Sequence, residues 1–524
     1  MNTIYAWNMV NPTLCYGRDG LLHELLKKLP GSPGCSFGIA GGRRMGKTTL
    51  LRRVEMALQT KIETGHSGGL HIIPLYIDGL TLPRPLIAAD VWKYLLQLLQ
   101  DALPTPPLPI PASLDFDLFK ATLKTILNNL AEQPRVIILF DEIEPVLVCE
   151  DWVGGFLANW RALLSNTPGL SEYLTAVFAG ARELALLQRD ITSPLADILE
   201  WRNLRVLEFE DACRLMQEPS GYEWSDAFLA RVYRETGGHP MLLQYIMQYV
   251  CSYDLAVAEH TLEQEIATFS HEHRRQFSQW WSRYCSLESR IIYARLPDDG
   301  SYIPLRQLTR EFGSTRTHEA LEILQHVGLS TADQDGLAFR YCGEMFRQWY
   351  QNHGKHDLDG IPKHDFDIYS RLNTIEQRLG DKYLTAWKIY QNPDLPNYSG
   401  AIAEMRDTLT LLLNVIAPKN EVMSESGFKL EPDMHEPTRK QRVAYAIRRL
   451  YGNKEQAKEV TSDYSLLEIE WDHLEHLAEH LPKVVRSAYN VASDMTHTTG
   501  SRERVYQALK QWDAILTYLT YSST

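Results

Sequence analysis

The sequence of 524 residues lacks any run of about 18 uncharged apolar residues, the length that a membrane-spanning helix needs. Its first segment, Met1 to Asn11, lacks the basic start and apolar stretch of a secretory signal. The seven cysteines are widely spaced and form no C-x-x-C pair, so neither a zinc site nor a redox pair is indicated. We therefore expect a cytoplasmic protein with free thiols and no membrane partner.

Positive charge is also scarce, because 53 Lys and Arg stand against 66 Asp and Glu and the formal net charge is −13 at pH 7. Nonspecific nucleic-acid binding depends on positive charge, so a surface basic throughout is excluded, although a local basic patch is not. The apolar fraction of 44% and charged fraction of 23% are ordinary for globular proteins, which excludes a wholly disordered chain. The length exceeds what one core supports, so we expect three or four domains.

One segment, Gly41 to Thr48, matches G-x-x-x-x-G-K-[ST] in full, between an apolar run and a helical pattern. Glycines let backbone N–H groups curl around phosphates, Lys47 neutralises the β and γ oxygens, and the Thr48 hydroxyl reaches Mg²⁺. The following helix points its positive end at the same anion. A glycine turn with a solvated Lys47 is the competing interpretation. The pattern predicts an ATP site with Mg²⁺ made by Gly41, Gly42, Arg43, Arg44, Met45, Gly46, Lys47, Thr48 and Thr49.

An acid pair follows about ninety residues later, where the apolar run Val136 to Phe140 closes on Asp141 and Glu142. In an ATPase, the first acid serves Mg²⁺ and the second polarises the attacking water. Alone, the pair is equally typical of a helix cap or a solvated turn. After a phosphate loop it predicts an ATPase in which Lys47, Asp141 and Glu142 are catalytic, and Thr48 and Asp141 are metal ligands. Turnover also requires a group that stabilises charge at the γ-phosphate.

The order of apolar runs and helical patterns predicts the domains. Four apolar runs separated by helical patterns are typical of a parallel sheet. After Glu208 the strand signals fade, and Gly328 to Tyr341 has the pattern of a two-stranded wing. We expect an α/β P-loop NTPase with a parallel sheet, then a helical subdomain, a winged helix and a mainly α C-terminal domain. The predicted bounds are 1–208 for the ATPase domain, 209–284 for the helical subdomain, 285–350 for the winged helix, 351–366 for a linker and 367–524 for the C-terminal module.

Short motifs in this order resemble the STAND NTPases, AAA-related switch ATPases of bacteria and archaea. The motifs are Tyr16-Gly17-Arg18, Gly42 to Leu51, Leu139-Phe140-Asp141-Glu142, Phe178-Ala179-Gly180, Ser193-Pro194-Leu195 and Gly237-Gly238-His239-Pro240. The resemblance covers about two thirds of the chain, from Leu14 to Trp349.

The resemblance implies roles for the matching residues. Tyr16, Gly17 and Arg18 would lie near the adenine, and His239 and Pro240 would sense the nucleotide at the junction with the helical subdomain. For His239 taken alone, an ordinary helix start is an equal alternative. We add Arg182, just past the fourth apolar run, as a candidate sensor of the γ-phosphate; a solvated arginine is the alternative.

The predicted winged helix has two interpretations. Its helix Thr315 to His326 can enter a DNA major groove with Arg316 and His318 at its start. The same helix carries Glu319 and Glu322 and so has no basic stripe. We therefore favour packing on the nucleotide domain as part of the switch.

The C-terminal region is similar to helical modules of prokaryotic conflict proteins, some of them nuclease-associated. One hypothesis makes His497 a general acid or base for RNA or DNA cleavage, with phosphate held by Arg439, Arg442 and Arg486. The other, which we favour, is a capping histidine beside surface arginines. Acids at metal-ligand spacing are lacking, so a two-metal nuclease is not indicated.

Together these patterns predict a cytoplasmic switch that binds and hydrolyses ATP and controls a C-terminal effector or a partner protein. The resemblance further implies a role in antiphage defence. Among partners, we also expect an ATP-dependent homo-oligomer. Two alternatives stay open. One is a DNA-associated, initiator-like ATPase that uses the winged helix, and the other is a scaffold in which ATP is structural.

Overall fold

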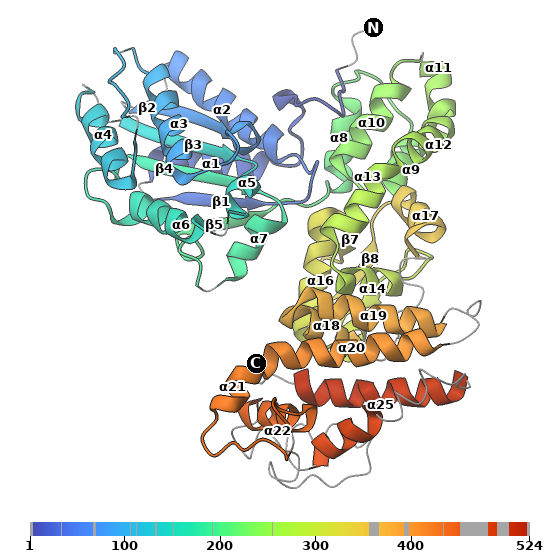
Figure 1. The fold of residues 1–524 in the computed structure, drawn as a ribbon. Helices are drawn as coiled ribbons and strands as arrows, with labels where there is room; N and C mark the ends of the chain where they lie inside the picture. Colours follow the sequence, from blue (N-terminus) through green and yellow to red (C-terminus); the bar gives the residue numbers. More distant parts are fainter. Residues whose placement is uncertain are drawn as a thin grey trace. The chain divides into compact units, whose positions relative to one another are not determined.

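The computed structural model describes residues 4–32, 34–65, 70–104, 106–111, 113–130, 134–149, 151–190, 192–253, 255–355, 366–391, 398–432, 434–450, 480–489 and 502–520. The chain divides into two compact units, 1–356 and 357–524, which are described separately (Figure 1). None of the helices in these ranges is both long and apolar enough to cross a membrane.

The first unit opens on a parallel sheet, as predicted, but with five strands where the sequence indicated four, in the order β2-β3-β4-β1-β5. The strands are β1 (Ser36–Ala40), β2 (His71–Asp78), β3 (Pro134–Asp141), β4 (Leu174–Gly180) and β5 (Leu199–Asn203). Every residue of β3 and β4 is buried, which explains their continuously apolar sequences. The fold class is therefore confirmed as a parallel-sheet α/β P-loop ATPase fold with helix-rich segments after it.

Helices cover both faces of this sheet because successive side chains of a strand point to opposite faces. Ile137 and Leu139 of β3 pack with one core cluster, whereas Ile138 and Phe140 pack with the other. The helices of the domain are η1 (Pro12–Leu14), α1 (Asp19–Gly31), α2 (Lys47–Glu63), η2 (Gly79–Thr81), α3 (Ala88–Asp101), α4 (Phe116–Asn128), α5 (Glu144–Leu147), α6 (Val153–Arg161), η3 (Ala162–Asn166) and α7 (Arg182–Arg189).

The rest of the first unit is mainly helical. The helices are α8 (Phe209–Gln217), α9 (Asp226–Thr236), α10 (Pro240–Val250), α11 (Leu255–Ala258), η4 (Glu259–Thr261), α12 (Leu262–Glu272), α13 (Arg274–Gln279), η5 (Trp280–Tyr284), α14 (Leu287–Arg295), α15 (Leu305–Phe312), α16 (Ser314–Val327) and α17 (Glu344–Asn352). Three short strands form an antiparallel sheet: β6 (Ile303–Pro304), β7 (Ser330–Ala332) and β8 (Ala338–Tyr341). We call residues 287–352 the α14–α17 segment.

The second unit is a group of helices around its own core. They are α18 (Phe366–Ile375), α19 (Gln377–Gln391), α20 (Ser399–Ile416), α21 (Lys419–Ser424), α22 (Arg439–Leu450) and α25 (Arg502–Thr520), with a further helical stretch at 480–489. Trp387, Leu409 and Trp512 are buried in this core. The buried Tyr383 hydroxyl donates to Asp513 Oδ1 at 2.9 Å and joins α19 to α25.

Candidate nucleotide-binding site

The phosphate loop connects the end of β1 to the start of α2. Strand β1 lies between β4 and β5, and the chain then crosses to β2 at the far edge of the sheet. In open α/β sheets, such a change of direction at the carboxyl ends of strands forms the ligand crevice. Gly46, with φ 90°, caps α2 in the left-handed region where only glycine is at ease. The free N–H groups of the first turn of α2 therefore begin directly at the loop.

Lys47 is the first residue of α2, and its side chain is almost fully buried. Its ammonium donates to the carbonyl oxygens of Gly41 and Gly42, both at 3.0 Å, and so lies over the loop. A cavity of about 190 Å³ opens beside it, and its wall includes Arg43, Arg44, Gly46, Lys47, Thr48, Thr49 and Glu142. With Pro240, eight of the predicted site residues thus surround one cavity.

The acid pair lies at the carboxyl end of β3, as predicted. Asp141 is buried and accepts two hydrogen bonds, from the Tyr76 hydroxyl to Oδ2 at 2.7 Å and from the Glu142 N–H to Oδ1 at 3.0 Å. Glu142 has φ 47°, a left-handed conformation that is unusual for this residue and is typical of strained functional sites. Gly79 permits this turn, because an added Cβ there would overlap the Glu142 carbonyl oxygen.

The residues at this end of the sheet fit a magnesium ion. Mg²⁺ prefers hard oxygen ligands, and Thr48 and Asp141 offer a hydroxyl and a carboxylate. Each Asp141 oxygen accepts one hydrogen bond and keeps a further lone pair for a metal-bound water or the metal. When bound, the ion would bridge and neutralise phosphate oxygens.

A third acid, Glu144, joins the site and was missed by the sequence analysis. It accepts a hydrogen bond from the Ala181 N–H just beyond β4, and its Oε2 is buried without a partner among the described residues. Burial raises the pKa of Glu144 to about 7, while nearby Lys47 lowers it and Glu142 raises it further. The only signal for this residue in the sequence is its position two residues after the acid pair.

The residues predicted to surround adenine lie around a second, adjoining cavity. Tyr16 and Arg18 line it together with Met45, Leu207 and Leu215, and it shares Gly46, Thr49, Pro240 and Gln244 with the first. Arg18 donates to the Arg205 carbonyl oxygen. Gly17, with φ 66°, lies against Leu207 and Asp211, where a Cβ has no room. The structure thus brings the first motif to the phosphate loop.

His239 and Pro240 begin α10 and differ in what they face. Pro240 lines both cavities. The His239 ring is buried, stacks on Trp280 with centroids 4.4 Å apart, and accepts the Met241 N–H through Nδ1 at 3.3 Å. Burial lowers the pKa of His239 to about 3, so the ring is neutral. Pro240 can therefore contact a nucleotide bound in these cavities, whereas the His239 ring is buried against Trp280.

Arg182, the predicted γ-phosphate sensor, is the first residue of α7 and is exposed. It lines neither of the two cavities. Its role as a γ-phosphate sensor therefore stays a prediction.

The C-terminal end of α16 packs directly on the phosphate loop, a contact that the sequence analysis did not predict residue by residue. The Gly42 N–H donates to the His326 carbonyl oxygen at 2.7 Å, and an added Cβ on Gly42 would overlap that oxygen. An ion pair between Arg189 of α7 and Glu322 of α16 supports the contact. Burial lowers the pKa of His326. One N–H of the loop is thereby occupied by the chain itself.

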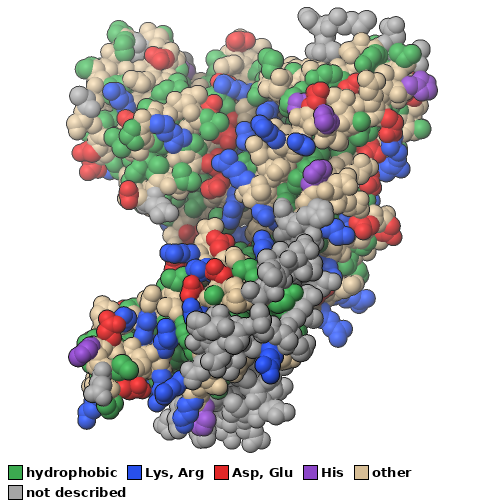
Figure 2. All heavy atoms as spheres, turned by 45° about the vertical axis from the view of Figure 1, so that its right-hand side comes forward, with side chains coloured by type: hydrophobic (Ala, Val, Ile, Leu, Met, Phe, Trp, Pro, Cys, Tyr) green, Lys and Arg blue, Asp and Glu red, His purple; other side chains and the backbone are tan. Residues whose placement is uncertain are grey.

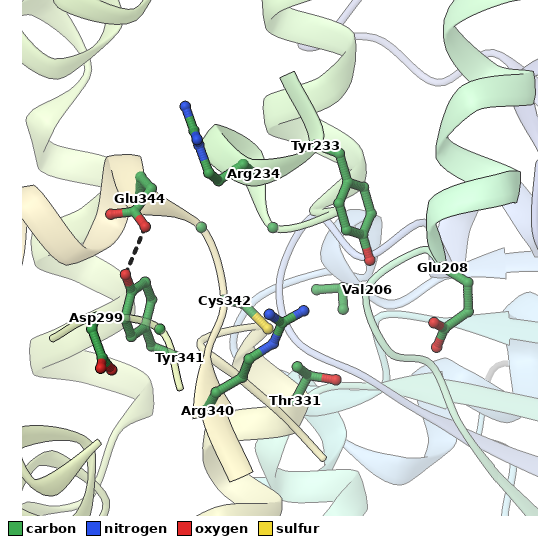
Figure 3. A pocket seen from close by; sticks show the side chains of 13 residues that line it. Val206, Glu208, Tyr233, Arg234, Asp299, Thr331, Arg340, Tyr341, Cys342 and Glu344 are labelled. Carbon is green, nitrogen blue, oxygen red and sulfur yellow. Dashed lines mark hydrogen bonds between the residues drawn. The ribbon is translucent and has the colours of Figure 1, made fainter. Parts of the chain in front are cut away.

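A third cavity, of about 260 Å³, lies between residues 206–208, the end of α9 and the α14–α17 segment (Figure 3). The Tyr341 hydroxyl donates to Glu344 Oε1 at 2.6 Å on one side, and Glu208 lies on the other side, with Arg340 between. Gly237 and Gly343 also line the cavity, and their backbones lie so close together that a Cβ on Gly237 would overlap the Gly343 nitrogen. At Gly237, the wall of this cavity therefore adjoins the segment that carries His239 and Pro240.

In the second unit, two of the three arginines predicted to hold phosphate have structural partners. Arg442 is buried and donates to the Ala417 carbonyl oxygen at 2.9 Å and to Asn414 Oδ1 at 2.8 Å. The Arg439 guanidinium lies over the Tyr489 ring at 4.0 Å, and Arg486 is exposed. His497 lies outside the described residues. The contacts of Arg442 therefore favour a structural role over the hypothesis that it holds phosphate.

Other basic residues of α22 are paired with acids. Lys440 pairs with Glu431, Arg448 with Glu425 and Arg449 with Glu421. Figure 2 likewise shows Lys and Arg interspersed with Asp and Glu on the face in view. Within the described ranges, no group of three or more His, Cys, Asp or Glu residues could hold a metal ion.

Comparisons with known proteins give one family match and several solved structures of similar fold. A family model described as "Predicted pPIWI-associating nuclease" matches residues 372–504. No curated protein matches the chain. Among solved structures, the chain is similar to the Walker-type ATPase PABY2304 of Pyrococcus abyssi, with 16% identity, 64% of this chain and 96% of that chain covered, and a TM-score of 0.42.

Two further structures are similar to the same extent. They are ORC2 of Aeropyrum pernix (15% identity, 67% and 98% covered, TM-score 0.40) and Cdc6p of Pyrobaculum aerophilum (14% identity, 68% and 99% covered, TM-score 0.38). Likenesses of this size carry no functional argument. The fold assignment stands on the sheet order and the phosphate loop of this chain.

Proposed function

We propose that this chain is an ATP-binding switch in which the docked end of α16 and the nucleotide phosphates compete for the phosphate loop. The observation that carries the proposal is the hydrogen bond from the Gly42 N–H to the His326 carbonyl oxygen. A phosphate loop functions by offering its N–H groups to phosphate oxygens. The docked helix occupies one of these donors.

Electrostatics supports the same conclusion. The C-terminus of a helix carries roughly half a negative charge, and His326 lies in the last turn of α16. Phosphate groups beside that helix end would be repelled, while Lys47 attracts them. ATP therefore favours the arrangement in which α16 has moved away. A ligand shifts such an equilibrium only by its differential affinity for the two states.

Hydrolysis is the second part of the proposal. Glu142 borders the cavity and carries the carboxylate that would polarise water, with Thr48 and Asp141 as the metal ligands and Lys47 on the phosphates. Hydrolysis to ADP would then allow α16 to dock again. A scaffold with structural ATP would bind nucleotide without turnover.

The C-terminal unit is proposed to be the effector. The support is the match of residues 372–504 to a family described as a predicted nuclease. Incubation of the full chain with RNA and with DNA, in the presence of ATP and in its absence, tests this assignment. The same assay on Lys47→Ala tests whether nucleotide controls it. The antiphage role implied by the resemblance and the expected ATP-dependent homo-oligomer belong to this proposal.

The test of the switch uses Glu322→Gln, which removes the ion pair with Arg189 without touching the loop. A partly exposed ion pair contributes about 0.2–1 kcal/mol, so ATP affinity should rise up to about fivefold. Glu319→Gln, an exposed change on the same helix, is the control and should leave affinity unchanged. Equal or weaker ATP binding by Glu322→Gln in calorimetry would contradict competition between α16 and phosphate.

A further inference from the structure

Tyr76 lies beside the acid pair on the neighbouring strand. Tyr76 belongs to β2 and is paired with Leu139 of β3, which lies two residues before Asp141. Its hydroxyl donates to Asp141 Oδ2 at 2.7 Å, and the other carboxylate oxygen accepts the Glu142 N–H at 3.0 Å. With one hydrogen bond on each oxygen, the Asp141 carboxylate is fixed in its plane.

Arg52 in turn fixes Tyr76. Its guanidinium carbon lies 3.3 Å from the centre of the Tyr76 ring, and its NH1 pairs with Glu55 Oε2 at 2.8 Å. A planar guanidinium stacks well on an aromatic face. Arg52 belongs to α2, the helix that also carries Lys47 and Thr48. A continuous set of contacts thus links the helix with the hydroxyl ligand to the strand with the carboxylate ligand.

We propose that Tyr76 is a positioning residue for the magnesium site, holding Asp141 in one orientation relative to Thr48, and that Arg52 holds Tyr76. The inference deepens the proposed ATPase function and rests on it. Mg²⁺ demands nearly ideal octahedral geometry, so a carboxylate that can rotate is a poorer ligand. Partners of this kind typically change metal affinity 10–100-fold when removed.

The variant Tyr76→Phe tests the proposal, because it deletes one hydroxyl and keeps the ring on which Arg52 stacks. ATP affinity is measured by calorimetry over a series of Mg²⁺ concentrations and in EDTA. We expect the Mg²⁺ concentration that gives half of the Mg²⁺-dependent gain in ATP affinity to rise about tenfold. The ATP affinity in EDTA should be unchanged. Tyr94→Phe on α3, whose ring packs against the other core cluster from that of Tyr76, is the matched control and should behave as the wild type.

A second variant, Arg52→Lys, keeps the positive charge and removes the planar stacking group. It should shift the Mg²⁺ dependence in the same direction but by less. Wild-type Mg²⁺ dependence in Tyr76→Phe overturns the positioning role and leaves the proposed function standing. An equal loss of ATP affinity with and without Mg²⁺ also overturns it, since that is the mark of a general structural role. ATP binding by the wild type that does not depend on Mg²⁺ overturns the magnesium site and the positioning role with it, whereas a wild type that binds no ATP overturns the proposed function.

Discussion

The backbone N–H of Gly42 and the carbonyl oxygen of His326 are joined by a 2.7 Å hydrogen bond across 284 residues of sequence. One residue belongs to the loop that receives phosphate, and the other to the last turn of α16. In the proposed switch, nucleotide occupancy and the position of the α14–α17 segment would therefore be parts of a single equilibrium.

Gly42→Ala should separate α16 from the loop. The added Cβ would overlap the His326 carbonyl oxygen, and forced overpacking costs about 1–3 kcal/mol. Hydrogen exchange of the α16 amides should become faster, while exchange of the β3 amides should change less. Unchanged protection of α16 would mean that the contact accommodates a methyl group.

Lys47→Ala should weaken ATP binding by at least tenfold, because it removes the ammonium at the phosphate position, while the fold is retained. Calorimetry with ATP measures the affinity, and circular dichroism checks the fold. Arg182→Ala is the comparison, since Arg182 is exposed and lines neither nucleotide cavity. Native affinity in Lys47→Ala would refute the site.

Glu142→Gln should bind ATP with Mg²⁺ as the wild type does and lose turnover by about 10²-fold or more, because an amide cannot accept the proton of water. Phosphate release measures turnover. A scaffold would release no phosphate in either form. Turnover at the native rate would mean that another group activates the water, and Glu144 would be the next residue to test.

Glu144 predicts a pH dependence of stability. Its pKa is raised in the folded state to about 7 from 4.5, so its contribution is fully present below pH 4.5 and is lost as the pH rises through 7. The loss is up to about 3 kcal/mol at 1.36 kcal/mol per pKa unit. Glu144→Gln should therefore be stabilised relative to the wild type more at pH 8 than at pH 5. Urea unfolding of the wild type and the variant at pH 5 and pH 8 measures this difference in stability. A difference that does not depend on pH would contradict the prediction.

A chain of residues 1–355 should stay soluble and bind ATP with full-length affinity, because both nucleotide cavities are lined by the first unit alone. Calorimetry on this chain and on its Lys47→Ala form makes the comparison. Precipitation or loss of binding would show that the helices after residue 357 complete the ATPase core.

Much of the ATPase fold could be predicted, because its strands are buried on both faces and its glycine pattern is local. The fifth strand could not. The sequence of β5, Leu-Glu-Trp-Arg-Asn, is polar because it is an edge strand whose Glu200 and Arg202 form ion pairs with α1. The parallel pairing with β1 appears only in the fold.

The site residues divide in the same way. Lys47, Thr48, Asp141 and Glu142 follow from short patterns. The pKa of Glu144 depends on burial, and the docking of His326 depends on contacts between distant segments, so neither has a local signal. In the C-terminal region, Arg442 belongs to a basic run and is nevertheless buried, because the fold supplies acceptors that sequence spacing does not reveal.

The left-handed backbone of Glu142 has a cost of its own. A non-glycine residue in this region is strained by about 1–3 kcal/mol. A glycine would relieve the strain and delete the carboxylate, whereas glutamate keeps the carboxylate and bears the strain. In the proposed mechanism, stability and turnover thus make opposite demands on one residue, and a glycine at that position would exchange the proposed turnover for greater stability.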